Sequence, residues 1–148
     1  MTAADPIAIE IRSGKAARFN NPGNLEFRGQ SGAIPDREAG RFAQFRTPEE
    51  GLEALERDIR AKQSGNTVTG LDASATLEHF SQVWLGGRAN RENSEATQRA
   101  HLEGMVFMLR DFDVSKRTPI GKIPTWALAQ AVAYVESETL VVRSLKEE

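Results

Sequence analysis

Three asparagines and one arginine surround a Pro-Gly pair in the stretch RFNNPGNL, residues 18–25. An asparagine amide both donates and accepts hydrogen bonds, which suits the hydroxyl and N-acetyl groups of a sugar. Loops on a rigid scaffold often carry such binding groups. The same stretch also suits a type II turn, with proline at the second position and a glycine of positive φ at the third. A purely structural turn is therefore the alternative interpretation of the candidate binding residues, which are Arg18, Asn20, Asn21 and Asn24.

Two glutamates near the end of the last predicted helix could supply an acid. Cleavage of a glycosidic bond needs a carboxylic acid that protonates the leaving oxygen, and partial burial keeps such a group neutral. Glu136 and Glu138 both lie at the margin of the apolar stripe of the helix, so helical geometry does not choose between them. Two solvated residues at a fraying helix end are the alternative interpretation. Tyr134, the only tyrosine, lies close to both in the sequence.

A second carboxylate would be needed as a base or nucleophile in a two-acid mechanism. Glu10, Glu26 and Glu92 are available, and the sequence pattern places none of them beside the last helix. A lytic transglycosylase needs only one glutamate, because a hydroxyl of the sugar itself attacks.

The aromatic residues and histidines favour structural interpretations. Trp84 and Trp126 could stack on sugar rings, but their helical spacing with apolar neighbours favours packing in the core. His79 and His101 lie on separate predicted helices without carboxylates at metal-binding spacing, so we interpret them as satisfied or solvated histidines. We expect no cofactor and no metal.

The composition is that of one ordinary folded domain. The chain has 148 residues, of which 39% are hydrophobic, enough to bury a core. A net charge of -2 gives no overall attraction for nucleic acid or anionic membranes, so any binding must be local. The absence of cysteine excludes disulfides and thiolate metal sites. Neither a signal peptide nor a membrane span is visible.

Periodicity and caps predict an α+β fold that is mostly helical, with a small N-terminal extended subregion. Alternating Ile7, Ile9 and Ile11 indicate a half-buried strand, and residues 13–46 are expected to be loop with short extended pieces. Thr47 followed by Pro48 is typical of a helix start. Four amphipathic helices are expected to pack together in a single domain over residues 1–148, at about residues 47–64, 76–85, 94–111 and 124–138.

Five motifs, taken in order, resemble those of a family of phage-virion and prophage proteins. The family carries an R-x-N-N-P-G-N loop, an F-x-x-F pair, a T-P-E-x-G helix start, and a tryptophan followed later by an E-N pair. These motifs stand here at residues 18–24, 42–45 and 47–51, at Trp84, and at residues 92–93. With the last helix included, the resemblance covers about residues 16–138.

The chain departs from the family pattern in two places. Leu85-Gly86-Gly87 replaces a proline pair after the tryptophan, and Glu138 stands where the family often has glycine. A looser resemblance links the chain to bacterial cell-wall glucosaminidases, whose helix and asparagine-rich loop occur in the opposite order. This rotated order implies a circularly permuted lysozyme-like arrangement, which is physically plausible because domain termini commonly lie close together.

The resemblance implies a lysozyme-like fold and a peptidoglycan-cleaving glycosidase or lytic transglycosylase. Glu136 would be the catalytic acid, and Arg18, Asn20, Asn21, Asn24 and Tyr134 would contact the substrate. A noncatalytic virion or secretion-machine component that keeps the scaffold is the alternative.

The expected partners are the peptidoglycan glycan strand and proteins of a phage or secretion machine, with no nucleic acid and no membrane span. The expected location is a phage virion, or the cytoplasm of a bacterial host with delivery to the periplasm.

Overall fold

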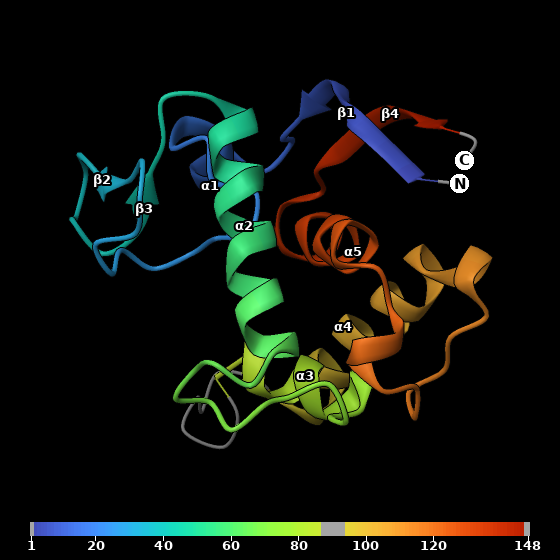
Figure 1. Ribbon diagram of the computed structural model, residues 1–148. Helices are drawn as coiled ribbons and strands as arrows, with labels where there is room; N and C mark the ends of the chain where they lie inside the picture. Colours follow the sequence, from blue (N-terminus) through green and yellow to red (C-terminus); the bar gives the residue numbers. More distant parts are fainter. Residues whose placement is uncertain (1, 87–93, 147–148) are drawn as a thin grey trace. The chain divides into compact units, whose positions relative to one another are not determined.

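The computed structural model describes residues 2–86 and 94–146 of the chain (Figure 1). These residues form a small α+β protein that is about 47% helical, which confirms the α+β part of the predicted fold class. They group into two compact units. Unit 1 contains residues 1–57 and 132–148, and unit 2 contains residues 58–131. The expectation of one domain over the whole chain stays a prediction.

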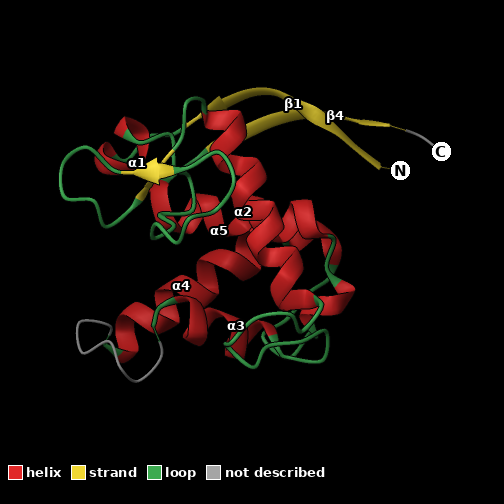
Figure 2. Ribbon diagram, turned by 60° about the vertical axis from the view of Figure 1, so that its left-hand side comes forward, coloured by secondary structure: helices red, strands yellow, loops and turns green. Residues whose placement is uncertain are grey.

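Unit 1 contains two small antiparallel sheets. Strands β1 (Thr2–Glu10) and β4 (Leu140–Lys146) run side by side and pair Ile9 with Val141. Figure 2 shows these two strands in yellow, running alongside each other. Strands β2 (Ile34–Pro35) and β3 (Ala43–Gln44) form the second sheet, which lies within the stretch expected to be mostly loop. The short helix α1 (Gly14–Arg18) was not predicted.

The predicted N-terminal strand is correct in place, and Ile9 and Ile11 are half-buried as predicted, whereas Ile7 is not. Strand β1 ends at Glu10, and the side chain of Ile7 is 69% exposed. Register shifts on both sides of Pro6 place Ile7 outside the paired positions, so the simple alternation of faces is broken there. Strand β4 was not predicted, because its partner β1 lies at the other end of the sequence.

The predicted helices are all present. Helix α2 (Pro48–Gln63) begins after Thr47, whose hydroxyl oxygen accepts a hydrogen bond from the backbone N–H of Glu50 at 3.1 Å. Its N-terminal part packs in unit 1, where Ala54 belongs to a buried cluster with Ala43 and Phe45.

Unit 2 contains two helices with hydroxyl caps. Helix α3 (Leu77–Trp84) is capped by Thr76, and helix α4 (Glu95–Met108) is capped by Ser94. Two short 3-10 helices follow α4, at Arg110–Phe112 and Ile120–Lys122. The predicted helix end near residue 111 therefore includes a change from α to 3-10 geometry. Fully buried side chains of this unit include Leu77, Phe80, Met105, Leu109, Ile120 and Leu128.

Helix α5 (Thr125–Ser137) is buried on more of its surface than the predicted single stripe. Residues 127–129 and 131–133 are all buried, and the four alanines among them lie on more than one face of the helix. The helix begins in unit 2 and ends in unit 1. Within the described ranges, no helix combines the length and the apolar character needed to cross a membrane.

Candidate active site at the asparagine turn

The asparagine turn, which we define as residues 20–24, closes with a hydrogen bond from the backbone N–H of Asn24 to the carbonyl of Asn21 at 3.1 Å. The predicted type II turn is wrong. The residues with positive φ are Asn20, at 52°, and Asn24, at 50°, whereas Gly23 is not in the left-handed region. Gly23 is instead required by packing, because a Cβ atom there would lie 2.6 Å from Cδ1 of Leu55 on α2.

The side chain of Asn21 is fully committed to the fold of unit 1. Only 1% of the residue is exposed. Its amide nitrogen donates to the carbonyl oxygens of Leu25 at 2.9 Å and Ala43 at 2.8 Å, and its amide oxygen accepts from the backbone N–H of Leu25 at 2.9 Å. This amide therefore joins the turn to strand β3.

Asn20 joins the turn to the start of α2. Its amide nitrogen donates to the carbonyls of Phe45 at 3.0 Å and Arg46 at 3.1 Å. Its own carbonyl oxygen lies so close to Gly51 that a Cβ atom on that residue would overlap it. The glycine of the T-P-E-x-G motif therefore permits the close approach of the helix to the turn.

Asn24 joins the turn to the end of α5. Its amide nitrogen donates to the backbone carbonyl of Glu136 at 3.1 Å. Beside it, the hydroxyl of Ser137 donates to the carbonyl of Pro22 at 2.6 Å, and the carbonyl of Ser137 accepts from the N–H of Ser13 at 3.1 Å. Unit 1 thus brings together the turn and the helix end that carries the predicted acid. Ser137 ends the helix segment that resembles the cell-wall glucosaminidases, but it was not among the predicted site residues.

The two candidate acids differ in their surroundings. Glu136 lies within α5 and is half-buried, as is Tyr134 one half-turn before it. Glu138 lies beyond the helix, is exposed, and has a φ of 51°. Its N–H donates to the carbonyl of Tyr134 at 2.8 Å, which is the usual left-handed termination of a helix. Glycine favours that conformation, whereas Glu138 adopts it with a side chain.

Arg18 is held by Glu38 in a two-pronged ion pair. Its Nε lies 2.7 Å from Oε2 of the carboxylate and its Nη2 lies 2.9 Å from Oε1. The hydrogen bond from Arg18 lowers the pKa of Glu38 below its ordinary value. Arg18 is the last residue of α1, and the ion pair binds its guanidinium to the loop that follows β2.

The other candidate carboxylates lie elsewhere in unit 1 or outside the described residues. Glu10 ends strand β1, and its Oε1 lies 3.6 Å from Nε of Arg12. Glu26 follows the asparagine turn by two residues. Its Oε2 lies 3.3 Å from Nη2 of Arg28, and its Oε1 lies 3.2 Å from Nη2 of Arg41. Glu92 is outside the described residues.

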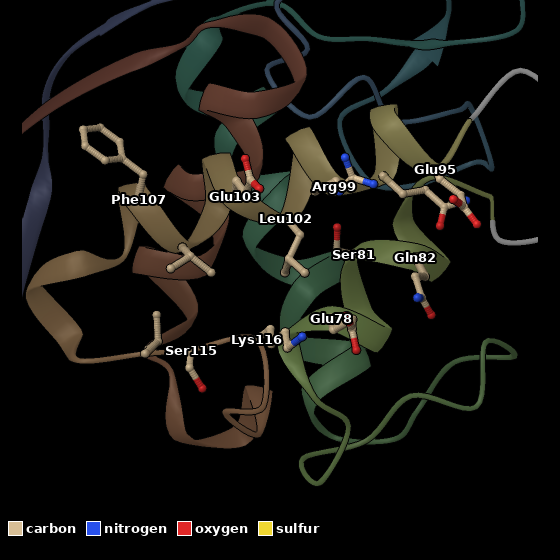
Figure 3. A pocket seen from close by; sticks show the side chains of 13 residues that line it. Glu78, Ser81, Gln82, Glu95, Arg99, Leu102, Glu103, Phe107, Ser115 and Lys116 are labelled. Carbon is tan, nitrogen blue, oxygen red and sulfur yellow. The ribbon is translucent and has the colours of Figure 1, made fainter.

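A cavity of about 780 Å³ lies in unit 2 between α3, α4 and the connector at residues 114–116 (Figure 3). Leu102, Val106 and Phe107 contribute apolar side chains from α4, and Ser81 contributes a hydroxyl from α3. The lining residues include none of those predicted to bind or cleave a sugar.

His101 has a structural role in unit 2. Its Nδ1 lies 2.6 Å from the hydroxyl oxygen of Ser81, and the residue is buried. Burial lowers the pKa of His101 to about 4, so the ring is neutral near pH 7. His79 is exposed on α3.

The two tryptophans are half-buried and pack against other aromatic rings. The ring of Trp84 lies 5.6 Å from that of Phe80, and the ring of Trp126 lies 5.7 Å edge-on from that of Phe112. In the part of the chain that the structure describes, no group of three or more His, Cys, Asp or Glu residues is suited to hold a metal ion. A comparison with known proteins found no protein family and no curated protein that matches this chain.

Proposed function

We propose that this protein is a peptidoglycan-cleaving glycosidase or lytic transglycosylase with a lysozyme-like, circularly permuted fold, and that Glu136 is its acid. The observation that carries the proposal is the hydrogen bond between the amide of Asn24 and the backbone of Glu136. It joins the sugar-suited turn to the acid-bearing helix end, although the two lie far apart in the sequence. The pairing of β1 with β4 supports the permuted order, because it brings the first and last strands together.

Burial supports Glu136 over Glu138 as the acid. A general acid at neutral pH needs a site that disfavours its charged form, and a half-buried side chain is better placed for this than an exposed one. A mechanism with one glutamate suffices for transglycosylation, in which the hydroxyl of the sugar attacks in place of water. Two of the proposed substrate contacts are linked to Glu136. Tyr134 lies two residues before it on the same half-buried part of α5, and Asn24 donates a hydrogen bond to its backbone carbonyl.

The bonding of the asparagine amides favours a second candidate function. Asn20, Asn21 and Asn24 all donate to backbone carbonyls within unit 1, so a structural role accounts for their amide nitrogens. A noncatalytic virion or secretion-machine component would keep this scaffold and bind the wall without cleaving it. Its partners would be phage or secretion-machine proteins together with the glycan strand.

Substitution of the two glutamates tests the enzymatic proposal. Glu136→Gln should reduce the loss of turbidity of purified sacculi by at least about a hundredfold, with little change in melting temperature. Glu138→Gln is the matched control and should retain the activity. Mass spectrometry of the products then separates hydrolysis, which leaves reducing ends, from transglycosylation, which leaves anhydro-sugars.

Two results would contradict the proposal. Full activity of Glu136→Gln would assign the acid to another residue. A native protein that sediments with sacculi but releases no soluble fragments would favour the noncatalytic component. In either case, delivery from a virion, or from the host cytoplasm to the periplasm, remains the proposed route to the wall.

A further inference from the structure

Positive charge is concentrated in one segment of this acidic chain. Residues 12–46 contain seven Lys or Arg and three Asp or Glu, a net charge of +4, whereas the whole chain has -2. All of this segment belongs to unit 1. A polyanion would therefore be attracted to this segment and not to the molecule as a whole.

Two of these cations, Lys15 and Arg41, lie over one aromatic ring, and a third, Arg28, is ion-paired beside them through Glu26. We call this group the Phe42 cluster: Lys15, Glu26, Arg28, Arg41 and Phe42. The ammonium nitrogen of Lys15 lies 3.7 Å from the centroid of the Phe42 ring, and the guanidinium carbon of Arg41 lies 5.0 Å from the same centroid. Glu26 is the only carboxylate of the cluster and is shared between Arg28 and Arg41. These five residues therefore carry a net charge of +2, which becomes +1 when the neighbouring carboxylate of Asp36, an acceptor of the Phe42 N–H, is counted.

The cations of the Phe42 cluster are accessible to a ligand. The side chains of Arg28 and Arg41 are 77% and 68% exposed, and Lys15 is exposed on α1. Like charges that share one ring repel each other, so an anion bound between them would lower the electrostatic energy. Guanidinium groups bind carboxylates with two parallel hydrogen bonds, which makes a carboxylate a well-matched anion.

The backbone that carries the cluster is fixed. Asp36 is buried and its carboxylate accepts hydrogen bonds from the N–H groups of Ala39 at 2.6 Å and Phe42 at 2.7 Å. These bonds hold the pKa of Asp36 well below its usual range, so the loop keeps its charge near neutral pH. The ring of Phe42 is therefore presented by a preorganised loop.

A short path of bonds within unit 1 connects the Phe42 cluster to the backbone of the proposed acid. The amide of Asn24 donates to the backbone carbonyl of Glu136. Glu26 follows Asn24 by two residues, and its backbone forms an isolated β-bridge with that of Phe42. Two residues of extended backbone span at most about 7 Å. The cluster and the backbone at Glu136 are therefore joined by a short connection in the same unit.

We propose that the Phe42 cluster binds the carboxylates of the stem peptides that peptidoglycan carries on its glycan strand. This inference rests on the proposed function, because it names the part of the wall that the same unit recognises. The sugar hydroxyl and N-acetyl groups are neutral, so the cluster would distinguish a peptide-bearing strand from a bare neutral polysaccharide. Binding at the cluster should weaken as salt is raised.

The test measures binding without cleavage, in a Glu136→Gln background. In that background the double variant Lys15→Gln/Arg41→Gln should bind untreated sacculi about tenfold more weakly at low salt. The matched control Arg12→Gln/Arg46→Gln removes the same charge from exposed positions of the same segment and should change binding less than twofold. Sacculi whose carboxylates have been converted to amides should bind the parent and the cluster variant equally.

Four outcomes would overturn the inference: unchanged affinity of the cluster variant, an equal loss in the control, unchanged affinity of the parent for amidated sacculi, and tighter binding to duplex DNA than to sacculi. Cleavage is scored separately, on the protein with Glu136 intact. Peptide-dependent binding by a protein that cleaves nothing would keep the inference and overturn the enzymatic proposal.

Discussion

The amide nitrogen of Asn24 lies 3.1 Å from the backbone carbonyl oxygen of Glu136, 112 residues along the chain. The last carbonyls of an α-helix have no partner within the helix, so the amide satisfies a group that α5 leaves open. The bond also fixes the backbone from which the Glu136 side chain extends. One contact thus stabilises the helix end and positions the proposed acid.

Two substitutions of Asn24 separate the contribution of its side-chain amide to stability from that of its backbone conformation. Asn24→Gly keeps the positive φ and loses the hydrogen bond, so we expect a loss of about 1 kcal/mol in the free energy of unfolding. Asn24→Ala also places a Cβ atom in a left-handed conformation and should lose about 2 kcal/mol. Urea unfolding measures both values. If the amide positions Glu136, both variants should also have a lower kcat on sacculi, whereas equal stability of Asn24→Gly and the native protein would remove the capping role.

Asn21 is expected to act through stability. Asn21→Ala removes three hydrogen bonds from a site that is 1% exposed and should cost about 3 kcal/mol. The control Asn66→Ala changes an exposed loop asparagine and should stay within about 0.5 kcal/mol of the native value. A variant of Asn21 that keeps native stability but loses wall binding would show instead that this amide contacts sugar.

The helices were predictable because their signals are local. Thr47, Thr76 and Ser94 each stand directly before an apolar stripe, and each hydroxyl accepts a backbone N–H three residues on. Strand β4 was not predicted. Its β-branched Val141 and Val142 are a local strand signal, but the pairing with β1 at the other end of the sequence cannot be seen locally.

The candidate site was predictable in its residue types but not in its contacts. The amides of the turn stood out as a group, yet each donates to a carbonyl chosen by the tertiary structure, such as Ala43 for Asn21. The turn type was wrong for a related reason. Gly23 was assigned to a positive φ from its place after proline, whereas the packing of Leu55 is what excludes a side chain there.

Glu138→Gly should stabilise the protein. Glu138 ends α5 with a φ of 51°, a conformation that costs a non-glycine residue about 1 kcal/mol. The substitution should therefore raise the free energy of unfolding by up to that amount, partly offset by the greater freedom of glycine in the unfolded chain. Calorimetry compares the two melting temperatures, and activity on sacculi should be retained if Glu136 is the acid. A lower melting temperature would mean that the exposed Glu138 side chain makes a stabilising contact.

The buried histidine of unit 2 predicts a pH dependence of stability between pH 6.5 and about 4. The folded protein holds the pKa of His101 at about 4, below its ordinary value of 6.5. As the pH falls through this range, the unfolded chain takes up a proton that the folded chain does not, so stability falls by up to about 3 kcal/mol in total. The lowered pKa of Asp36 acts in the same direction only at lower pH, because the unfolded carboxylate titrates near pH 4.

Urea unfolding at pH 7, 5.5 and 4.5 measures this slope. His101→Gln can still form a hydrogen bond with Ser81 but has no titrating ring, so its stability should change much less over the same range. The native protein and the variant should therefore differ most at pH 7 and converge toward pH 4.5. Parallel slopes would show that another group takes up the proton, and a flat native profile would mean that His101 becomes charged in the folded protein without penalty.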